Sequence, residues 1–285
     1  MHTITSRWQQ QDQVRIEWNL GKRCNYDCSY CPSEIHDHNS PHTDIEILKS
    51  TIDILSKIDK PVRISFTGGE PCVHPKFKEL VDYAKFKGIY WVNVTTNGTR
   101  QPEYYMNLNV DHIVFSLHFE HDWRRVMTTI IKVQKESNKT VLVNIMVHPD
   151  KVDDAKLCCS RFQLAGVKYT LRRIRWTQGN HDLFDDMRYH PDDLQWMLNV
   201  ESTVHANCVV NDGESYIHAN DILKHKLNNF KDWTCYAGIE SLMINWDGEV
   251  YRATCRVGGS LGNIYNNVVS IPTDPITCTR AWCTC

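Results

Sequence analysis

The sequence lacks a long hydrophobic run, a low-complexity tract and an excess of charge of either sign. Its mainly apolar stretch at 141–147 falls far short of the roughly 20 residues that a helix needs to span a bilayer. Residues 1–13 are polar and lack the apolar segment of a secretory signal. The net charge is only −2, which gives no reason to expect binding to nucleic acid or to a membrane surface. These absences predict a globular, cytoplasmic protein.

Cysteine, by contrast, is abundant, at 12 of 285 residues, and most of it falls in two parts of the chain. The first group comprises Cys24, Cys28 and Cys31, and the second comprises Cys235, Cys255, Cys278, Cys283 and Cys285. A cytosolic protein keeps its thiols reduced, so clustered cysteines favour metal binding over disulfides. The sequence therefore predicts two separate metal centres.

Six segments with β-strand character alternate with helical segments in the first part of the chain. The expected strands are 14–20, 62–66, 90–95, 113–117, 141–147 and 169–174, and two of the helices cover 45–58, capped at Thr43, and 123–131. This alternation is typical of parallel βα units. It stops near residue 176, whereas a full eight-unit barrel needs about 250 residues. The pattern predicts an α/β fold, either a partial barrel or an open sheet, with its ligand site at the carboxyl ends of the strands.

The rest of the chain is organised differently. Residues 177–232 are polar and mixed, with one helix expected to start at Pro191. Residues 242–251 predict a β-hairpin that turns at Asp247-Gly248, within the second cysteine group. We therefore expect a barrel core over 1–176, a linking helical region over 177–232 and a small α+β hairpin extension over 233–285.

The first cysteine group follows the first expected strand with the spacing Cys24-x3-Cys28-x2-Cys31. Three thiolates are too few for a closed tetrahedral zinc site, although another part of the chain could supply a fourth ligand. On a four-iron cubane, three thiolates leave one iron open to an exogenous ligand. The second strand ends in Thr-Gly-Gly-Glu-Pro at 67–71, which in isolation reads as an ordinary turn.

This cysteine triplet, with the aromatic Tyr30 before its last member, and the Gly-Gly-Glu run at 68–70 resemble the signature of the radical S-adenosylmethionine (radical SAM) superfamily. The resemblance covers about residues 14–175 and implies a partial (β/α)6 TIM-like barrel. It also implies a [4Fe–4S] cluster whose open iron binds the amino and carboxylate groups of SAM. Reductive cleavage of SAM would then give methionine and a 5′-deoxyadenosyl radical that abstracts hydrogen from a substrate. An electron donor such as a flavodoxin or ferredoxin would supply the electron.

Several strand-end residues are expected to bind SAM. They are Tyr30, Gly68, Gly69, Glu70, Thr96, Ser116 and Asn144. The glycines remove side chains, so that the backbone can approach a ligand closely. By resemblance, Tyr30 would lie near the adenine and Ser116 is a stronger ribose contact than Asn144. Both Ser116 and Asn144 could instead serve only to satisfy backbone groups.

Other polar residues give weaker signals. His118 and Glu120, just past the fourth strand, are candidates for proton transfer. Arg173, one of several arginines near the sixth strand, could bind an anionic group of the substrate or simply form a salt bridge. The histidines at 36, 38 and 42 suggest a metal site, but a solvated loop is the favoured interpretation, because no strand or helix is expected to fix their geometry.

The second cysteine group, spaced Cys235-x12-Gly248-x6-Cys255 and then Cys278-x4-Cys283-x-Cys285, resembles the twitch or SPASM extension of some radical SAM enzymes. Such an extension holds an auxiliary cluster. The resemblance departs from the usual pattern, because six residues rather than four separate the glycine from the next cysteine. Five cysteines fit the shorter twitch form, with one [4Fe–4S] cluster. We expect Cys235, Cys255, Cys278 and Cys283 as ligands, with Cys285 as the alternate and structural zinc as the alternative metal.

The substrate cannot be identified from the residues. Only about thirteen residues precede the first strand, which favours a small or nucleotide-like molecule over a peptide. Two alternatives remain open: a peptide-modifying radical SAM maturase, and a non-catalytic iron–sulfur protein for electron transfer or sensing.

Overall fold

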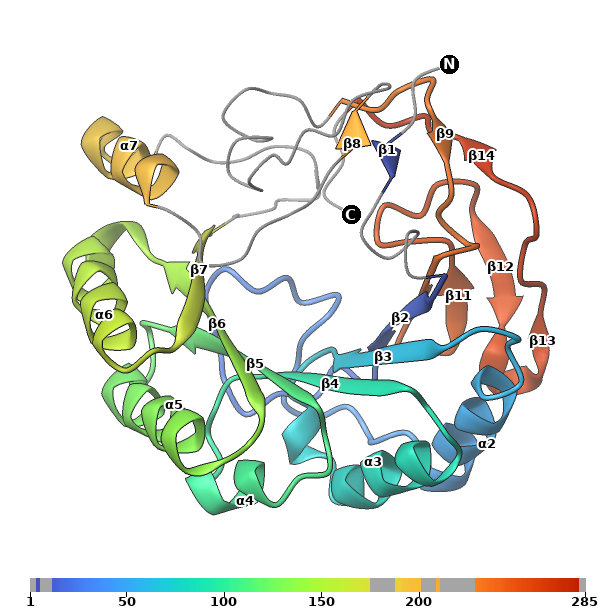
Figure 1. Cartoon of the computed structure of the whole chain (residues 1–285), viewed down its shortest axis with the longest axis horizontal. Helices are drawn as coiled ribbons and strands as arrows, with labels where there is room; N and C mark the ends of the chain where they lie inside the picture. The colour runs from blue at the N-terminus through green and yellow to red at the C-terminus, as the bar shows by residue number, and fades with distance from the viewer. Residues whose placement is uncertain (1–3, 6–11, 175–187, 201–208, 211–228, 282–285) are drawn as a thin grey trace.

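The computed structural model describes residues 4–5, 12–174, 188–200, 209–210 and 229–281. Its centre is a curved, mostly parallel sheet with helices along the outer side, which confirms the predicted α/β partial barrel (Figure 1). Six parallel strands lie side by side in chain order: β2 (Val14–Asn19), β3 (Val62–Thr67), β4 (Trp91–Thr96), β5 (His112–His118), β6 (Thr140–Val147) and β7 (Lys168–Arg173). All six predicted strands are therefore present.

Helices and short 3-10 turns connect these strands. The helices are α2 (Ile45–Leu55), α3 (Phe77–Phe86), α4 (Pro102–Met106), α5 (Trp123–Glu136) and α6 (Val152–Leu164), and the turns are η1 (Pro71–Val73) and η2 (Pro149–Lys151). Alternate strand residues such as Ile16 and Trp18 are fully buried against apolar helix residues such as Leu48 and Ile52. This layer between sheet and helices forms the core, and the other face of the sheet carries polar side chains such as Ser116 and Asn144 together with apolar ones such as Met146.

The start of α2 differs from the prediction. The N-cap is Asp44, whose carboxylate accepts a hydrogen bond from the Glu46 amide, rather than Thr43. The Thr43 hydroxyl instead donates to the Leu20 carbonyl at 3.5 Å. A carboxylate at this position also interacts favourably with the positive end of the helix dipole.

The predicted hairpin is present, and it extends the barrel sheet. Strand β10 (Ser241–Ile244) pairs in parallel with β2, and β11 (Glu249–Tyr251) follows it antiparallel. The turn requires Gly248, since its φ is +86° and a Cβ there would lie 2.5 Å from the Tyr265 ring. Strands β12 (Ser260–Asn263) and β13 (Val268–Val269), joined by η4 (Ile264–Asn266), complete this side of the sheet.

Two further strand pairs lie outside the main sheet. Strand β9 (Thr234–Cys235) pairs with β14 (Ile276–Thr277), and β1 (Ile4–Thr5) pairs with β8 (Val209–Val210). Within the predicted linking region, helix α7 (Pro191–Asn199) begins at the expected proline. Most of the region 177–232 lies outside the described residues, so the three-part division of the chain remains a prediction.

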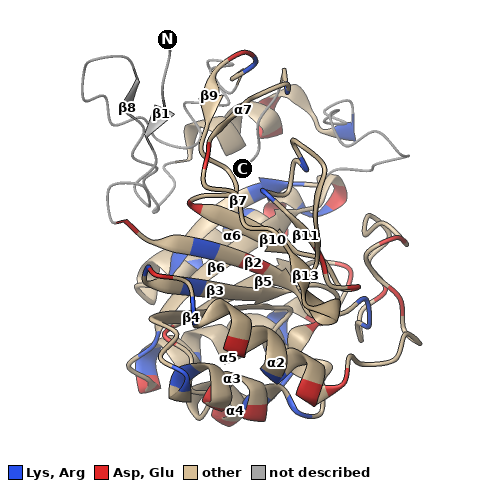
Figure 2. Ribbon diagram, turned by 90° about the vertical axis from the view of Figure 1, so that its right-hand side faces the viewer, with Lys and Arg blue, Asp and Glu red and all other residues tan. Residues whose placement is uncertain are grey.

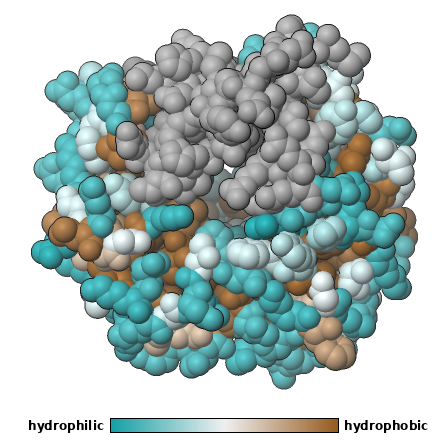
Figure 3. Space-filling view, viewed as in Figure 1, coloured by the Kyte–Doolittle hydropathy of each residue, from teal (hydrophilic) through white to brown (hydrophobic). Residues whose placement is uncertain are grey.

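The described surface is mixed in charge and polarity. Figure 2 shows basic and acidic residues interspersed over the outer helices, and Figure 3, which has the view of Figure 1, shows mainly hydrophilic residues along the lower edge of the molecule. Among the described residues, no helix combines the length and the apolar character needed to cross a membrane.

Candidate functional site

The carboxyl ends of the parallel strands and the loop after β2 surround a cavity of about 620 Å³. Most of the predicted site residues line it: Cys24, Cys28, Tyr30, Cys31, Gly68, Gly69, Glu70, Thr96, Ser116, His118, Asn144 and Arg173. Glu120 does not line it, because this residue contacts the cysteine loop through Ser29, and the cysteines of the second group lie elsewhere or outside the described residues. The structure thus brings together residues that the sequence spreads over 150 positions.

The Gly-Gly-Glu segment packs directly on the start of the cysteine loop. The Gly69 amide donates to the Gly21 carbonyl at 2.8 Å, and the Glu70 amide donates to the Arg23 carbonyl at 2.9 Å. A Cβ at position 69 would lie 2.3 Å from the Arg23 carbonyl oxygen, and one at position 68 would lie 2.6 Å from that of Gly21. The glycines therefore permit close contact between two backbone segments of the site, in addition to any approach to a ligand.

The Glu70 side chain joins the ends of β3 and β4. Its carboxylate accepts hydrogen bonds from the Cys72 amide at 2.9 Å, the Thr96 hydroxyl at 2.8 Å and the Asn97 amide at 2.6 Å. Burial raises the pKa of this carboxyl, whereas the three donors oppose that rise. The side chain is thus committed to the protein, and a ligand would meet mainly the backbone of this segment.

Two of the three thiols of the loop have polar neighbours within the cavity wall. The Cys24 sulfur accepts a hydrogen bond from the Tyr26 amide at 3.4 Å, and the Cys28 sulfur lies 3.6 Å from His118 Nδ1. Burial raises the pKa of Cys28 to about 12 and that of Cys31 to about 11. Without metal these thiols are protonated at neutral pH, so metal binding must release protons.

The spacing of the sulfurs separates two metal assignments. A single zinc ion binds thiolates at about 2.3 Å, so two of its ligand atoms lie at most about 4.6 Å apart. In the part of the chain that the structure describes, no group of three ligand atoms that lie within 4.8 Å of one another includes a cysteine. A cubane binds each cysteine through a different iron and therefore tolerates wider spacing. The residues present fit a cubane better than a single ion.

His118 and Tyr30 form a contact next to Cys28. The Tyr30 hydroxyl lies 2.6 Å from His118 Nδ1, and the two rings are stacked with centroids 6.0 Å apart. Burial lowers the pKa of His118 to about 4. The imidazole is therefore neutral at physiological pH and has a single N–H to donate.

Glu120 contacts the cysteine loop from the other side. Its carboxylate accepts hydrogen bonds from the Ser29 amide at 2.7 Å and from the Ser29 hydroxyl. It also lies 3.6 Å from His148 Nε2. These contacts hold the backbone next to Cys28. Proton transfer to a ligand in the cavity would require the carboxylate to leave them.

The far side of the cavity is formed by β5, β6, β7 and α7. Ser116 and Asn144 are direct neighbours in the register of β5 and β6. The Asn144 side-chain oxygen accepts hydrogen bonds from the Thr170 hydroxyl at 2.8 Å and from Arg172 Nε at 3.3 Å. Arg173 also lines the cavity here. This side therefore presents hydroxyl, amide and guanidinium groups.

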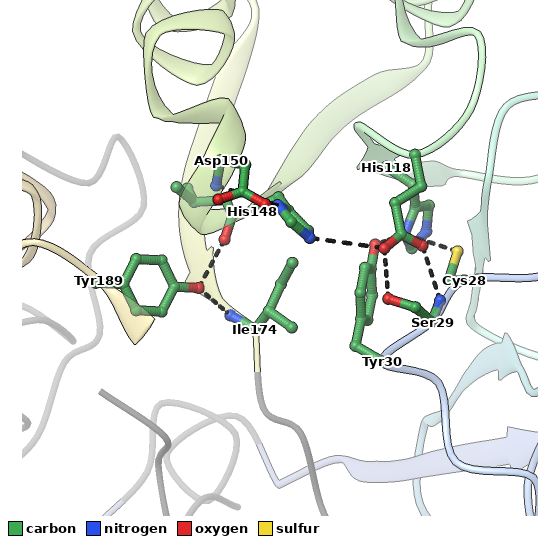
Figure 4. Close-up of polar contacts among 10 residues, drawn as sticks. Cys28, Ser29, Tyr30, His118, His148, Asp150, Ile174 and Tyr189 are labelled. Atoms are coloured by element: carbon green, nitrogen blue, oxygen red, sulfur yellow. Dashed lines mark hydrogen bonds and ion pairs between the residues drawn. The ribbon is translucent and has the colours of Figure 1, made fainter. Parts of the chain in front are cut away.

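Sequence reasoning missed the apolar part of this wall. It comprises Met146, Leu171, Met197 and Leu198. Met197 and Leu198 come from α7. The sequence predicts that this helix starts at Pro191, but it does not predict which residues of the helix face the cavity. The Tyr189 hydroxyl, which donates to the Val147 carbonyl at 2.7 Å and accepts from the Ile174 amide at 2.8 Å, ties the approach to α7 to the ends of β6 and β7 (Figure 4).

Three cysteines of the second group belong to one small unit. Cys235 lies on β9 opposite Ile276, and Cys235 and Cys255 pack on a core that includes Ala253. Arg280 Nη2 donates to the Cys255 carbonyl at 2.7 Å, and the Arg280 carbonyl lies 4.0 Å from the buried Cys278 sulfur. The predicted ligands Cys283 and Cys285 lie outside the described residues.

Residues 18–157 match the protein family described as the radical SAM superfamily. The chain is 39% identical over 87 residues to the Fe-coproporphyrin III synthase of Methanosarcina barkeri, and the aligned segment covers 30% of this chain and 21% of that protein. It is 36% identical over 110 residues to the GTP 3′,8-cyclase of Chlorobaculum tepidum, and the aligned segment covers 37% of this chain and 32% of that protein. The matched segments thus span about a fifth to a third of these relatives.

The fold is similar to that of Streptococcus suis SuiB. The SuiB structures bound to S-adenosylmethionine and to the precursor peptide SuiA give TM-scores of 0.61 and 0.60, at 14% identity, and cover 90% of this chain and 64% of SuiB. The family match includes the cysteine triplet and the Gly-Gly-Glu segment, and this family implies a [4Fe–4S] cluster and SAM as cofactors. The chain belongs to the radical SAM superfamily.

Proposed function

We propose that this chain is an enzyme that cleaves SAM reductively and uses the resulting radical to abstract hydrogen from a substrate. The observation that carries this proposal is the shared cavity. The cysteine triplet, the Gly-Gly-Glu segment and the polar ends of β4, β5 and β6 all line one space of about 620 Å³. A non-catalytic iron–sulfur protein has no need for such a space beside its cluster.

The cluster would be held by Cys24, Cys28 and Cys31. When bound, it supplies the one-electron reduction that breaks a carbon–sulfur bond of SAM, with the electron delivered by a carrier such as a flavodoxin or ferredoxin. The backbone of the Gly-Gly-Glu segment would accept hydrogen bonds from the SAM ammonium group. Ser116 and Asn144 would bind the ribose, Thr96 would assist from β4, and Tyr30 would lie along the adenine.

The substrate would lie between SAM and the apolar wall. Met146, Leu171 and Met197 remove solvent from that part of the cavity, which matters because a primary carbon radical abstracts hydrogen from whatever lies next to it. Arg173 would bind an anionic group of the substrate. His118 would stay neutral and orient Tyr30 and the Cys28 thiolate.

A second [4Fe–4S] cluster would occupy the C-terminal extension, 233–285. Its ligands would be Cys235, Cys255, Cys278 and Cys283, with Cys285 as the alternate. The packing of Cys235 and Cys255 on one small core and the link through Arg280 to Cys278 support this assignment. Such a cluster could accept the second electron of a two-electron oxidation.

Anaerobic reconstitution with iron and sulfide tests both clusters. The loaded protein should be brown and hold about eight iron atoms per chain. The triple variant C24A/C28A/C31A and the single variant C235A should each lose about half of the iron. C158A, which removes a buried thiol on α6, is the matched control and should keep it all. A colourless protein that binds zinc would contradict the assignment.

Incubation with SAM and dithionite tests the activity. Wild-type protein and C158A should produce 5′-deoxyadenosine, and the triple variant should produce none. If the brown protein holds its clusters and binds SAM but releases no 5′-deoxyadenosine, the chain is an electron-transfer or sensing protein.

A peptide substrate is the second candidate, because the SuiB fold that covers 90% of this chain is solved with a precursor peptide bound. A cell extract separated by size distinguishes a peptide from a small or nucleotide-like molecule as the substrate. Stimulation of 5′-deoxyadenosine formation by the low-mass fraction supports a small molecule. Stimulation by a larger fraction that protease treatment abolishes supports a peptide.

A further inference from the structure

We propose that Asp27, His36 and His38 form a site for one divalent transition-metal ion of the Zn²⁺ type, separate from both clusters. One ligand atom from each of the three residues lies within 4.8 Å of the others. His38 Nε2 lies 3.7 Å from Asp27 Oδ1, and the two imidazole rings meet edge to face with centroids 5.5 Å apart. Two imidazoles and one carboxylate are ligands that zinc prefers in proteins.

The hydrogen bonds of the two histidines prepare them as ligands. His38 Nδ1 lies 2.9 Å from the Cys24 carbonyl, and His36 Nε2 lies 2.6 Å from the Tyr26 carbonyl. A carbonyl oxygen only accepts, so each of these nitrogens carries the proton and the other nitrogen of each ring carries a lone pair. Histidines that bind metals almost always donate their second N–H in this way, because the bond fixes both tautomer and ring orientation.

The backbone between the two histidines is itself held in place. The Cys24 amide donates to the Asp37 carbonyl at 2.8 Å, and the Asp37 amide donates to the Lys22 carbonyl at 3.0 Å, as in a short parallel bridge. The two histidines flank this bridge residue, and their rings lie with centroids 5.5 Å apart. The sequence alone assigned these histidines to a solvated loop, because this bridge is not visible in the residue pattern.

The geometry requires little adjustment to hold an ion. Zinc binds nitrogen and oxygen at about 2.0–2.2 Å, so its ligand atoms lie at most about 4.3 Å apart. The Asp27 side chain is 82% exposed and can move inward by the small remaining distance. Water would complete the coordination. The third histidine of the loop, His42, packs instead against His74 with ring centroids 4.8 Å apart.

An ion here would link the cysteine loop to the segment that follows it. Asp27 lies between the first two cysteines of the triplet, and the histidines follow the third. The site would therefore brace the loop whether or not the protein turns over a substrate, and the proposal does not depend on the proposed activity.

Zinc retention by the cluster-loaded protein tests the site, since the cysteines are then occupied by iron. After one equivalent of Zn²⁺ and anaerobic gel filtration, wild-type protein should retain about one zinc per chain. H38Q and D27N should bind zinc at least about tenfold more weakly. H42Q is the matched control and should bind as wild type does. Equal zinc in all four proteins, or none in wild type, overturns the proposal.

X-ray absorption at the zinc edge gives a second readout that needs no variant. The expected first shell contains only nitrogen and oxygen, at about 2.0–2.2 Å. Sulfur at about 2.3 Å would place the zinc on the cysteines and overturn the proposal, whatever the variants show.

Discussion

The Glu120 carboxylate accepts two hydrogen bonds from Ser29, one from the backbone amide and one from the hydroxyl. Ser29 lies between Cys28 and Tyr30, and both of these residues contact the neutral ring of His118. His118 is the last residue of β5, and Glu120 follows it two positions later. The end of β5 thus holds the cysteine loop at two points, through His118 inside the cavity and through Glu120 behind it.

We expect E120Q to weaken the cysteine loop. The amide keeps one acceptor oxygen but loses the charge, and hydrogen bonds to a charged group contribute about 1.5–3 kcal/mol. Iron content after reconstitution should fall, or the retained cluster should lose iron faster to a chelator. The matched control is E103Q, which removes an exposed carboxylate paired with Lys132 on the outer helices. If both variants hold iron equally well, Glu120 does not position the loop.

We expect G69A to disrupt the site, whereas G21A should leave it intact. A Cβ at position 69 would lie 2.3 Å from the Arg23 carbonyl oxygen, but one at position 21 meets nothing within 4 Å. Forcing extra atoms into such a contact costs about 1–3 kcal/mol. Thermal unfolding of the two variants measures the difference. A G69A protein as stable as G21A would show that the two backbone segments can separate freely.

Glu70 gives a prediction about the frame of the site. In E70Q one side-chain atom becomes an NH₂ donor facing a backbone amide or the Thr96 hydroxyl. We expect a loss of about 2–3 kcal/mol in the free energy of unfolding, because buried donors lose a charged acceptor. Denaturant unfolding measures this loss. E70D keeps the charge but shortens the side chain. If the charge matters, E70D should recover part of the lost free energy of unfolding. If only the length of the side chain matters, it should recover none.

His112 gives a prediction about pH. Burial, together with the nearby Arg63 and Lys168, lowers the pKa of His112 to about 4, below its ordinary value of about 6.5. The unfolded chain therefore binds a proton before the folded one does, so the stability present above pH 6.5 is lost as the pH falls toward 4. Each full unit of lowering corresponds to about 1.4 kcal/mol. H112N should lose less stability than wild type between pH 7 and pH 4.5, as measured by denaturant unfolding. Parallel curves for the two proteins would contradict this.

The local features of the fold follow well from the sequence. The strands alternate between buried and polar residues, and the helices begin near the predicted residues, because short-range periodicity and capping decide both. The pairing of β10 with β2 could not be predicted, since it joins segments more than 220 positions apart and depends on the final register of the whole sheet.

The candidate site divides in the same way. The cysteine triplet and the Gly-Gly-Glu segment stand out because special residue types recur at fixed spacing. The apolar wall from Met197 and Leu198 does not, because apolar residues on a helix look alike whether they face a core or a cavity. The bracing role of Glu120 was also hidden, since its partner Ser29 lies 91 positions earlier.

The pairing of β10 with β2 affects how the chain can fold as it is synthesised. In the finished protein β2 is an interior strand, with β3 on one side and β10 on the other. Until the ribosome has made residue 244, however, β2 has a neighbour on one side only and is the exposed edge of the nascent sheet. Open edges pair readily with other chains. The strand that leads into the cysteine loop thus stays open to such pairing until β10, near the C-terminal end of the chain, has been made.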